Sequence, residues 1–277
     1  MKKIKFSVLM SVYKNDTVDN VKIAIESLLH QTMLPSQIVI ISDGPIPAKL
    51  KDLLCEYEKN DLFDIYYRDV NLGLGPTLNE GLLKCKYDYV ARMDADDESL
   101  PERFENQLLY LESHSDIDAV GTIVDEYDEE MNYIISKKCV PETSREINKY
   151  LQSRNPINHP TIVYKKSKVL EVNGYEDFPY FEDYYLWAKM ICNGSKFYNI
   201  QKSLYKFRAG SSMIKRRGGK KYLSCIKKFE KALLDLGVID KNIYYKNLTK
   251  RYIVSLLPNG LRQMLYMKLL RKSVKED

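Results

Sequence analysis

Four carboxylates occupy positions 94–98 of the stretch ARMDADDESLP: Asp94, Asp96, Asp97 and Glu98. They directly follow the run YDYVARM, which predicts a buried strand. Such charges repel one another unless a cation neutralises them. Mg²⁺ and Mn²⁺ favour carboxylate, water and phosphate oxygens, commonly with only one or two protein carboxylates. The alternate spacing of Asp94 and Asp96 therefore suits a divalent cation held together with a polar ligand.

The acidic cluster has two other interpretations. Carboxylates favour helix N-termini, and Pro101 marks a predicted helix start, so the cluster could be a solvated acidic cap. A calcium loop beginning at Asp94 would need glycine where Ser99 stands, and it would follow a helix instead of a strand. The surrounding elements favour the divalent-cation interpretation.

Strand and helix patterns alternate four times in the first part of the chain. The predicted strands are residues 4–12, 36–44, 64–69 and 87–93, and the predicted helices are about 18–29, 48–60, 75–86 and 100–114. This alternation predicts the α/β class with a parallel, doubly wound sheet. Ligands bind beyond the carboxyl ends of the strands in such sheets. The polar residues expected at that edge are Tyr13, Asp43, Asn71 and Asp94–Asp97.

Several protein classes are disfavoured by the sequence. GLGPTL has two glycines of a dinucleotide-binding fingerprint, but Leu78 replaces the third and the stretch follows the third predicted strand. A P-loop is absent, and no run approaches the ~18 apolar residues of a membrane span. The five cysteines are odd in number and form no CxxC pair, which indicates free thiols in a reducing cytoplasm.

The charge is distributed unevenly. Residues 201–277 contain 20 Lys and Arg against 5 Asp and Glu, whereas residues 1–200 contain 23 against 33. A basic tail on an acidic body indicates a polyanionic partner, either an anionic membrane surface or a nucleic acid. Because no nucleic-acid-binding motif accompanies the charge, nucleic acid is the disfavoured partner.

Four motifs in order resemble family 2 glycosyltransferases, which have the GT-A fold. They are SVLMSVYKN with a helix reaching LLHQT, IVIISDG, NLGLGPTLNEG leading to ARMDADD, and FEDYYLW, and they span about residues 6–190. The resemblance implies inverting transfer of a sugar from a UDP-sugar to a hydroxyl of a saccharide acceptor, with Mn²⁺ or Mg²⁺. Many relatives use lipid-linked acceptors and build bacterial surface polysaccharides.

The same resemblance implies a GT-A catalytic domain over residues 1–210. Its nucleotide-sugar half would end at about 115, its acceptor half would cover about 116–210, and 211–277 would form a basic loop and a helical extension. A nucleotidyltransferase is an alternative, but it would need a Gly-rich triphosphate loop near the N-terminus, which SVLMSVYKN lacks. A non-catalytic nucleotide-sugar-binding protein is the other alternative.

The resemblance assigns a donor site. Asp43 would accept a hydrogen bond from the N–H of the uracil ring, with Val12 and Tyr13 flanking the base. The loop and helix start beneath the nucleotide would be Asn71, Gly73 and Asn79. The glycine would allow close backbone approach, although an ordinary turn also explains it.

The acidic cluster takes its role from the DxD motif of the family. Asp94 would contact the ribose or the metal, and Asp96 would coordinate the metal that bridges the diphosphate. Arg92 would reach the diphosphate; a surface ion pair with the cluster is its alternative. Asp97 and Glu98 would contact the residues that bind the metal without binding it themselves, or they would cap the next helix.

On the acceptor side, Asp183 of EDYYLW matches the family's general base. A carboxylate within ~3 Å of the attacking hydroxyl can take its proton, which contributes about 10²–10⁴-fold in rate. Glu182 and Asp183 would otherwise be helix caps. Trp187 lies four residues on and shares that helix face. It could stack on the acceptor sugar or belong to the core.

Two further segments match parts of related enzymes. His159, in NPINHPTIV, corresponds to a loop histidine near the nucleotide and is a possible metal ligand; a neutral loop histidine is the alternative. The stretch 207–222 contains Arg208, Arg216 and Arg217 and resembles a mobile loop that closes on phosphates. A solvated basic linker would have the same composition.

The tail alternates apolar and basic residues over 248–272. One helical face would carry Leu261, Met264, Leu265 and Leu269. This pattern suits a helix lying in an anionic membrane interface, and equally a helix packed on the catalytic domain. With a lipid-linked acceptor, the first alternative predicts a cytoplasmic protein bound peripherally to the inner face of the cytoplasmic membrane.

Overall fold

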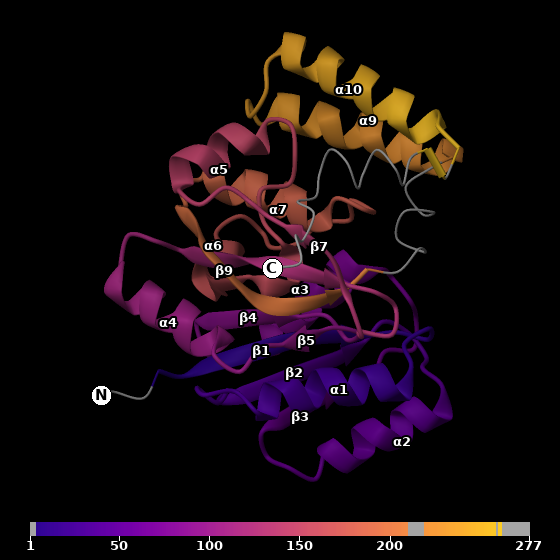
Figure 1. The fold of residues 1–277 in the computed structure, drawn as a ribbon, viewed down its shortest axis with the longest axis vertical. Coiled ribbons are helices and arrows are strands. Elements are labelled where there is room, and N and C mark those ends of the chain that lie inside the picture. Colours follow the sequence, from indigo (N-terminus) through magenta and orange to yellow (C-terminus); the bar gives the residue numbers. More distant parts are fainter. Residues whose placement is uncertain (1–3, 210–218, 259, 262–277) are drawn as a thin grey trace.

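The computed structural model describes residues 4–209, 219–258 and 260–261. Its described strands form one nine-stranded sheet in the order β3-β2-β1-β4-β8-β6-β9-β5, with β7 paired to β6 (Figure 1). The strands are β1 (Phe6–Val12), β2 (Gln37–Ser42), β3 (Phe63–Tyr66), β4 (Tyr89–Met93), β5 (Glu98–Ser99), β6 (Ala119–Tyr127), β7 (Ile134–Lys138), β8 (Val163–Lys165) and β9 (Phe197–Arg208).

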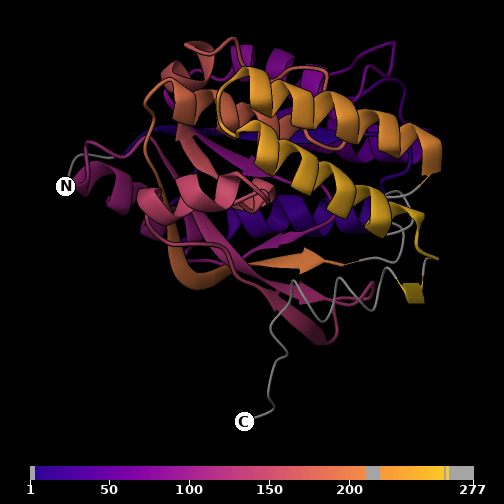
Figure 2. The ribbon, with the colours of Figure 1, turned by 90° about the horizontal axis from the view of Figure 1, so that it is seen from above.

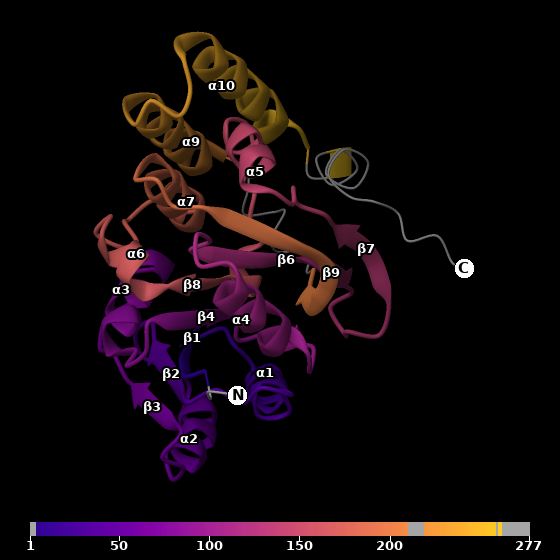
Figure 3. The same ribbon diagram turned by 90° about the vertical axis from the view of Figure 1, so that its left-hand side faces the viewer.

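Helices cover both faces of this sheet. They are α1 (Val18–Leu29), α2 (Ala48–Tyr57), α3 (Leu74–Lys84), α4 (Arg103–Ser113), α5 (Ser144–Leu151), α6 (Lys166–Leu170), α7 (Glu182–Cys192), α9 (Gly219–Asp235) and α10 (Lys241–Leu256), with the 3₁₀ turn η1 (His159–Thr161). In Figure 3, α3 and α6 lie on one side of the sheet and α1 and α4 on the other. This is the arrangement that the alternating pattern predicted.

The side chains of β1 point alternately to the two faces of the sheet, which explains why helices pack on both faces. Phe6, Val8 and Met10 pack in the core with residues of α1 and α4, whereas Leu9 packs in the second core with residues of α3 and α7. Successive strand side chains point to opposite faces, so an almost fully apolar strand needs helices on both sides. β1 pairs in parallel with β2 and β4, and β2 with β3.

The second half of the sheet is mixed. β8 runs antiparallel to both β4 and β6, while β6 and β9 are parallel. β7 ends at Lys138, and Pro141 just beyond it has no backbone N–H to extend the strand ladder.

The helices α9 and α10 form a further layer over α7 and run side by side (Figures 1 and 2). Phe229 of α9 stacks on Phe181 with ring centroids 4.3 Å apart. Arg251 of α10 pairs with Glu230 of α9 at 2.6 Å. The tail up to Leu256 thus packs on the α/β domain, which was one of its two expected arrangements. Residues 262–277, with most of the predicted apolar stripe, lie outside the described residues. No helix in the described ranges is long and apolar enough to cross a membrane.

Gly81 lets α3 pack closely on the sheet. A Cβ atom at this position would lie 2.6 Å from Leu9 Cδ1 and 3.1 Å from Ile41 Cγ2, and both of these side chains are fully buried. An alanine in a helix normally stabilises relative to glycine. Here the overlap with two packed side chains outweighs that gain.

We therefore expect Gly81→Ala to lower the free energy of unfolding by about 1–3 kcal/mol, the usual effect of overpacking. Urea denaturation measures this change. Leu83→Ala on the same helix is the control, because Leu83 is 63% exposed. It should change the stability by less than about 0.5 kcal/mol. A Gly81→Ala protein that is more stable than the wild type would contradict this account of the packing.

Candidate active site

The carboxyl ends of β1, β2 and β4 meet at one edge of the sheet, because these strands are parallel neighbours. Tyr13 follows β1, Asp43 follows β2 and Asp94 follows β4. The convergence of polar strand ends that the sequence predicted is therefore present.

The acidic loop, residues 94–98, is held by cationic side chains and by contacts with β9. Arg92, fully buried in β4, pairs with Asp94 at 2.5 Å. The backbone N–H of Arg208 donates to Asp97 Oδ1 at 2.7 Å, and its Nε donates to the Asp96 carbonyl at 2.8 Å. Glu98 pairs with Lys206 of β9 at 2.8 Å. Glu98 is therefore occupied by β9.

The remaining carboxylates are poorly neutralised. Burial and then the charge of Asp94 raise the pKa of Asp96 to about 6. Burial together with the charges of Asp96 and Asp94 raises the pKa of Asp97 well above its usual value. Asp97 Oδ2 is buried and has no hydrogen-bond partner among the described residues. The loop thus concentrates negative charge in a place where a cation would relieve it.

Asp16 is a member of this cluster that the sequence analysis did not identify. Its Oδ2 accepts a hydrogen bond from the Tyr13 backbone N–H at 2.8 Å. Burial foremost, with the charges of Asp96 and Asp94, raises its pKa to about 7. Asp and Thr are both favourable N-cap residues, and in the structure Thr17 is the one that caps α1, by accepting from the backbone N–H of Asn20. Asp16 instead adds a carboxylate to the cluster.

The donor set fits a hard divalent cation. In the part of the chain that the structure describes, no group of three His, Cys, Asp or Glu side chains gathers as a metal site. Mg²⁺ commonly takes only one or two protein carboxylates, with waters and substrate phosphates completing its shell. Asp94 and Asp96, repelling each other beside Asp97 and Asp16, meet that requirement.

The turn at 71–73 is fastened by Asp43. The backbone N–H groups of Leu72 and Gly73 donate to Asp43 Oδ1 at 2.9 and 3.2 Å, and the Asn71 side chain donates to the Asp43 carbonyl at 2.9 Å. Gly73 has φ +91°, a conformation that favours glycine. Val12 is buried, whereas Tyr13 is 37% exposed. These predicted donor residues therefore adjoin one another.

A cavity of about 320 Å³ joins the acidic loop to α7. Both Asp94 and Asp183 line it, with His159 and Asn155. Asn155 Nδ2 donates to Asp183 Oδ2 at 2.6 Å, which fixes the orientation of this carboxylate. Asp183 lies in the first turn of α7. The two acidic regions singled out in the sequence thus face one cavity.

His159 supplies a neutral imidazole to the wall of this cavity. Burial foremost, then the charges of Arg92 and Lys138, holds its pKa well below the usual value. Its Nε2 lies 3.1 Å from the hydroxyl of Tyr175. His159 and Asp94 thus line the same cavity, and the tyrosine hydroxyl occupies one ring nitrogen.

Three predicted contacts differ in the structure. Trp187 is fully buried and packs edge-to-face on Phe197, so it belongs to the core and has no exposed surface for an acceptor sugar. Arg92 is fully buried behind Asp94, so its charge reaches a ligand only through that carboxylate. Asn79 accepts from the Tyr175 backbone N–H at 3.2 Å and secures that loop instead of facing the nucleotide turn.

Arg208 and Glu182 remain near the site, and Arg216 and Arg217 lie outside the described residues. Burial foremost, then the charge of Asp183, raises the pKa of Glu182 to about 7. Glu182 packs against Gly75, since a Cβ there would lie 3.2 Å from Glu182 Cγ.

The aromatic wall of the cavity was not identified from the sequence. Tyr180, just before α7, has φ +74°, and its ring meets Tyr222 of α9 edge-to-face at 5.1 Å. Both rings line the cavity together with Arg251 of α10. A non-glycine residue at positive φ is often found at functional sites. The sequence signal was limited to a high tyrosine content.

Comparisons with known proteins identify the family of this chain. The family model for glycosyl transferase family 2 matches residues 7–171. The amylovoran biosynthesis glycosyltransferase AmsE of Erwinia amylovora is 36% identical over 95% of this chain and 98% of its own. The Escherichia coli UDP-Gal:alpha-D-GlcNAc-diphosphoundecaprenol beta-1,3-galactosyltransferase is 32% identical over 97% of both chains.

Solved structures show the same fold. S. aureus TarS 1–349 in complex with UDP-GlcNAc superimposes with a TM-score of 0.65 at 16% identity, over 90% of this chain and 72% of that one. The mannosyltransferase PcManGT from Pyrobaculum calidifontis, in complex with GDP-Man and Mn²⁺, has a TM-score of 0.61 at 13% identity, over 94% of this chain and 72% of that one. The structure has the GT-A fold, and the chain belongs to glycosyl transferase family 2.

Proposed function

We propose that this glycosyltransferase moves a sugar from a UDP-sugar to a hydroxyl of a lipid-linked saccharide, with inversion, in bacterial surface polysaccharide synthesis. The observation that carries the proposal is the cavity lined by both Asp94 and Asp183. The names of the two bacterial relatives support the pathway and the lipid-linked acceptor, and the name of one specifies a UDP-sugar.

The donor would lie along the edge formed by Tyr13, Asp43 and the acidic loop. Asp43 uses its carboxylate to hold the 71–73 turn, and it retains lone pairs for the N–H of a uracil ring. Asp94 and Asp96 would hold Mn²⁺ or Mg²⁺. When bound, that ion neutralises charge developing on the leaving diphosphate.

Asp183 is the proposed general base. Its carboxylate lies in the first turn of the helix, and Asn155 fixes its orientation, so that a carboxylate lone pair can take the proton of an acceptor hydroxyl placed in the cavity. The hydroxyl oxygen then forms its bond to the anomeric carbon while the bond to the diphosphate breaks. Glu182 is a poorer candidate, because this side chain packs against Gly75.

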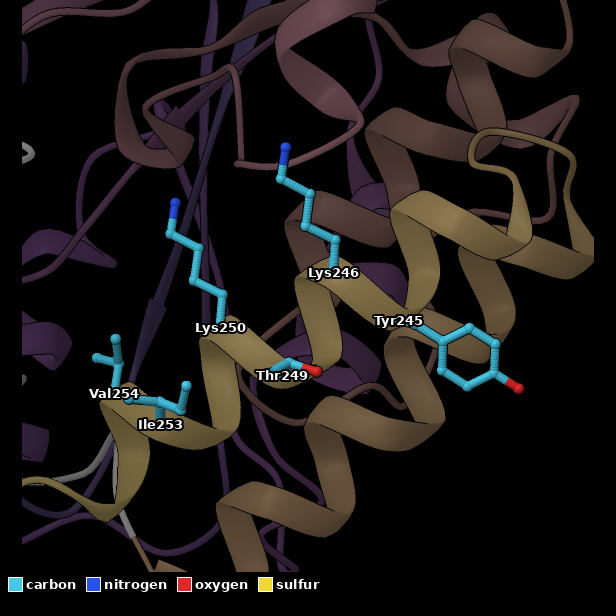
Figure 4. A pocket seen from close by; sticks show the side chains of 6 residues that line it. All are labelled: Tyr245, Lys246, Thr249, Lys250, Ile253 and Val254. Atoms are coloured by element: carbon cyan, nitrogen blue, oxygen red, sulfur yellow. The ribbon is translucent and has the colours of Figure 1, made fainter.

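The outer face of α10 supports peripheral binding to an anionic membrane. Figure 4 shows Lys246 and Lys250 projecting side by side from one side of the helix. Tyr245 and Ile253 form an adjacent row and are 64% and 59% exposed. An apolar row beside a basic row suits the headgroup region of an anionic bilayer. We therefore propose that the protein acts at the cytoplasmic face of the membrane.

We expect Asp96→Asn to abolish the dependence of UDP binding on Mn²⁺, because the substitution removes a charged ligand. Asp183→Asn should retain UDP binding and lower sugar transfer by about 10²–10⁴-fold, the usual contribution of a general base. A screen of nucleotide sugars with and without Mn²⁺, by calorimetry and by slow donor hydrolysis, checks UDP binding, and transfer from the donor so found to a lipid-linked saccharide checks the rate. Asp116→Asn, an exposed carboxylate change, is the control. If no nucleotide diphosphate binds with metal, the donor assignment is wrong.

The stability of the protein should depend on pH through Glu182. Glu182 ionises at about pH 7 in the folded protein and near 4.5 when unfolded, so the folded state binds more protons between these values. The free energy of unfolding therefore falls as pH rises through this window. Glu182→Gln should raise it by up to about 3 kcal/mol at pH ~8 and change it little at pH ~4.

Urea unfolding at both pH values measures this effect. Asp61→Asn, which removes an exposed carboxylate that does not act on Glu182, provides the control and should not reproduce the effect at pH ~8. A stabilisation by Glu182→Gln that is larger at the acidic pH would show that Glu182 is not the buried acid.

Membrane binding should depend on the exposed basic and apolar rows of α10. Lys246→Gln with Ile253→Ser should weaken sedimentation with phosphatidylglycerol vesicles by at least about tenfold, from the loss of one lysine and one inserted side chain. The control pair is Lys49→Gln with Leu34→Ser, which removes one exposed lysine and a leucine that is 51% exposed. Equal sedimentation of wild type and the α10 variant would defeat the proposal.

A further inference from the structure

The acceptor side of the cavity is lined by cations, in contrast to its acidic donor side. Lys138 ends β7, Arg154 follows α5, and Arg251 belongs to α10; all three line the cavity that contains Asp183. A sugar hydroxyl needs a carboxylate near it but has no need of three cations. A cation among them that the fold leaves without a carboxylate partner can bind negative charge on the acceptor close to the sugar.

Arg251 is partly committed to the fold. It pairs at 2.6 Å with Glu230, which is fully buried, and donates to the Ser153 carbonyl at 3.3 Å. Asn247 of the same helix donates to the Gln152 carbonyl at 2.7 Å. Two contacts from α10 thus hold the segment 152–153, and this fixes the position of Arg154 immediately after it.

Arg154 and Lys250 are the cations that remain for a ligand. Within the described residues neither forms an ion pair with a carboxylate. Burial, and then the charges of Arg154, Arg251 and Lys246, lowers the pKa of Lys250. These side chains are therefore close enough to repel one another, and an anion between them would relieve that repulsion.

The cations form a path from the cavity to the exposed face of α10. Arg154 and Arg251 line the cavity, while Lys250 and Lys246 line the groove on the outer face together with Tyr245 and Ile253 (Figure 4). A sugar at Asp183, a diphosphate beside Arg154 and a lipid chain toward the apolar row would follow the same order. This order matches the connectivity of a sugar-diphosphate-lipid.

We propose that Arg154 and Lys250 bind the diphosphate of the acceptor and thereby set the distance of its sugar hydroxyl from Asp183. This inference rests on the proposed function. Arginine offers a planar pair of donors to phosphate oxygens, and lysine adds a compact charge. The donor diphosphate is distinguishable, because it lies by a carboxylate cluster and needs a divalent cation, whereas this anion site needs none.

The test is calorimetric binding of decyl diphosphate to the full chain in the presence of EDTA. The wild type should bind it more tightly than neutral decyl maltoside, which has the same alkyl chain. Arg154→Gln and Lys250→Gln should each weaken diphosphate binding about tenfold, as expected for a charged hydrogen bond. Arg145→Gln removes an exposed arginine from α5 and should change it less than about twofold.

Each result has one meaning. If decyl diphosphate does not bind without metal, or if Arg154→Gln and Arg145→Gln behave alike, the anion site is wrong even where UDP binds with Mn²⁺. If decyl diphosphate binds and Arg154→Gln weakens it, while UDP fails to bind with Mn²⁺, the anion site stands and the donor assignment fails.

Discussion

The repulsion among the carboxylates beyond β4 is the constraint on which the site depends. Two buried arginines oppose it from the core: Arg92 pairs with Asp94, and Arg103 donates to the Arg92 carbonyl at 2.6 Å. Burying charged groups is unfavourable unless they are paired and hydrogen-bonded. Burial foremost, and then the charges of neighbouring carboxylates, still raises the pKa values of Asp16, Asp96 and Asp97. The packed sheet holds together a set of charges that would separate in a flexible loop.

The mixed part of the sheet places Asp183 at the same cavity as this acidic site. β8 inserts antiparallel between β4 and β6, and the segment leading into it contains Asn155 and His159. Asp94 and Asp183 are 89 positions apart in sequence, yet both line one cavity because this segment and α7 fold back over the end of β4. Asn155 then binds Asp183, so the residue that shapes the cavity wall also orients the carboxylate.

The sequence predicted the parallel strands and the acidic edge well, because apolar runs and strand-end residues obey local rules. The sequence was insufficient where the same residue type and spacing are compatible with two structural roles. Asp16 and Thr17 could each cap α1, and only the folded chain shows that Thr17 does so. Trp187 shares a helical face with Asp183, but the first turn of α7 borders the cavity while the next turn lies under β9, where Trp187 meets Phe197. The spacing of residues in the sequence predicts which of them share a helix face, but it does not predict which turn of that helix is buried.

The helix α10 shows why the basic tail could not be assigned to a single role. Its inner side carries Arg251 and Asn247, which bind Glu230 and the end of α5. Its outer side exposes Tyr245, Ile253 and two lysines. An amphipathic basic helix is usually assigned either to a membrane or to a protein core, yet this one has one side suited to each. Because both sides belong to one rigid helix, any surface that binds the outer side also positions the cavity wall, and a lipid-linked acceptor would meet both at once.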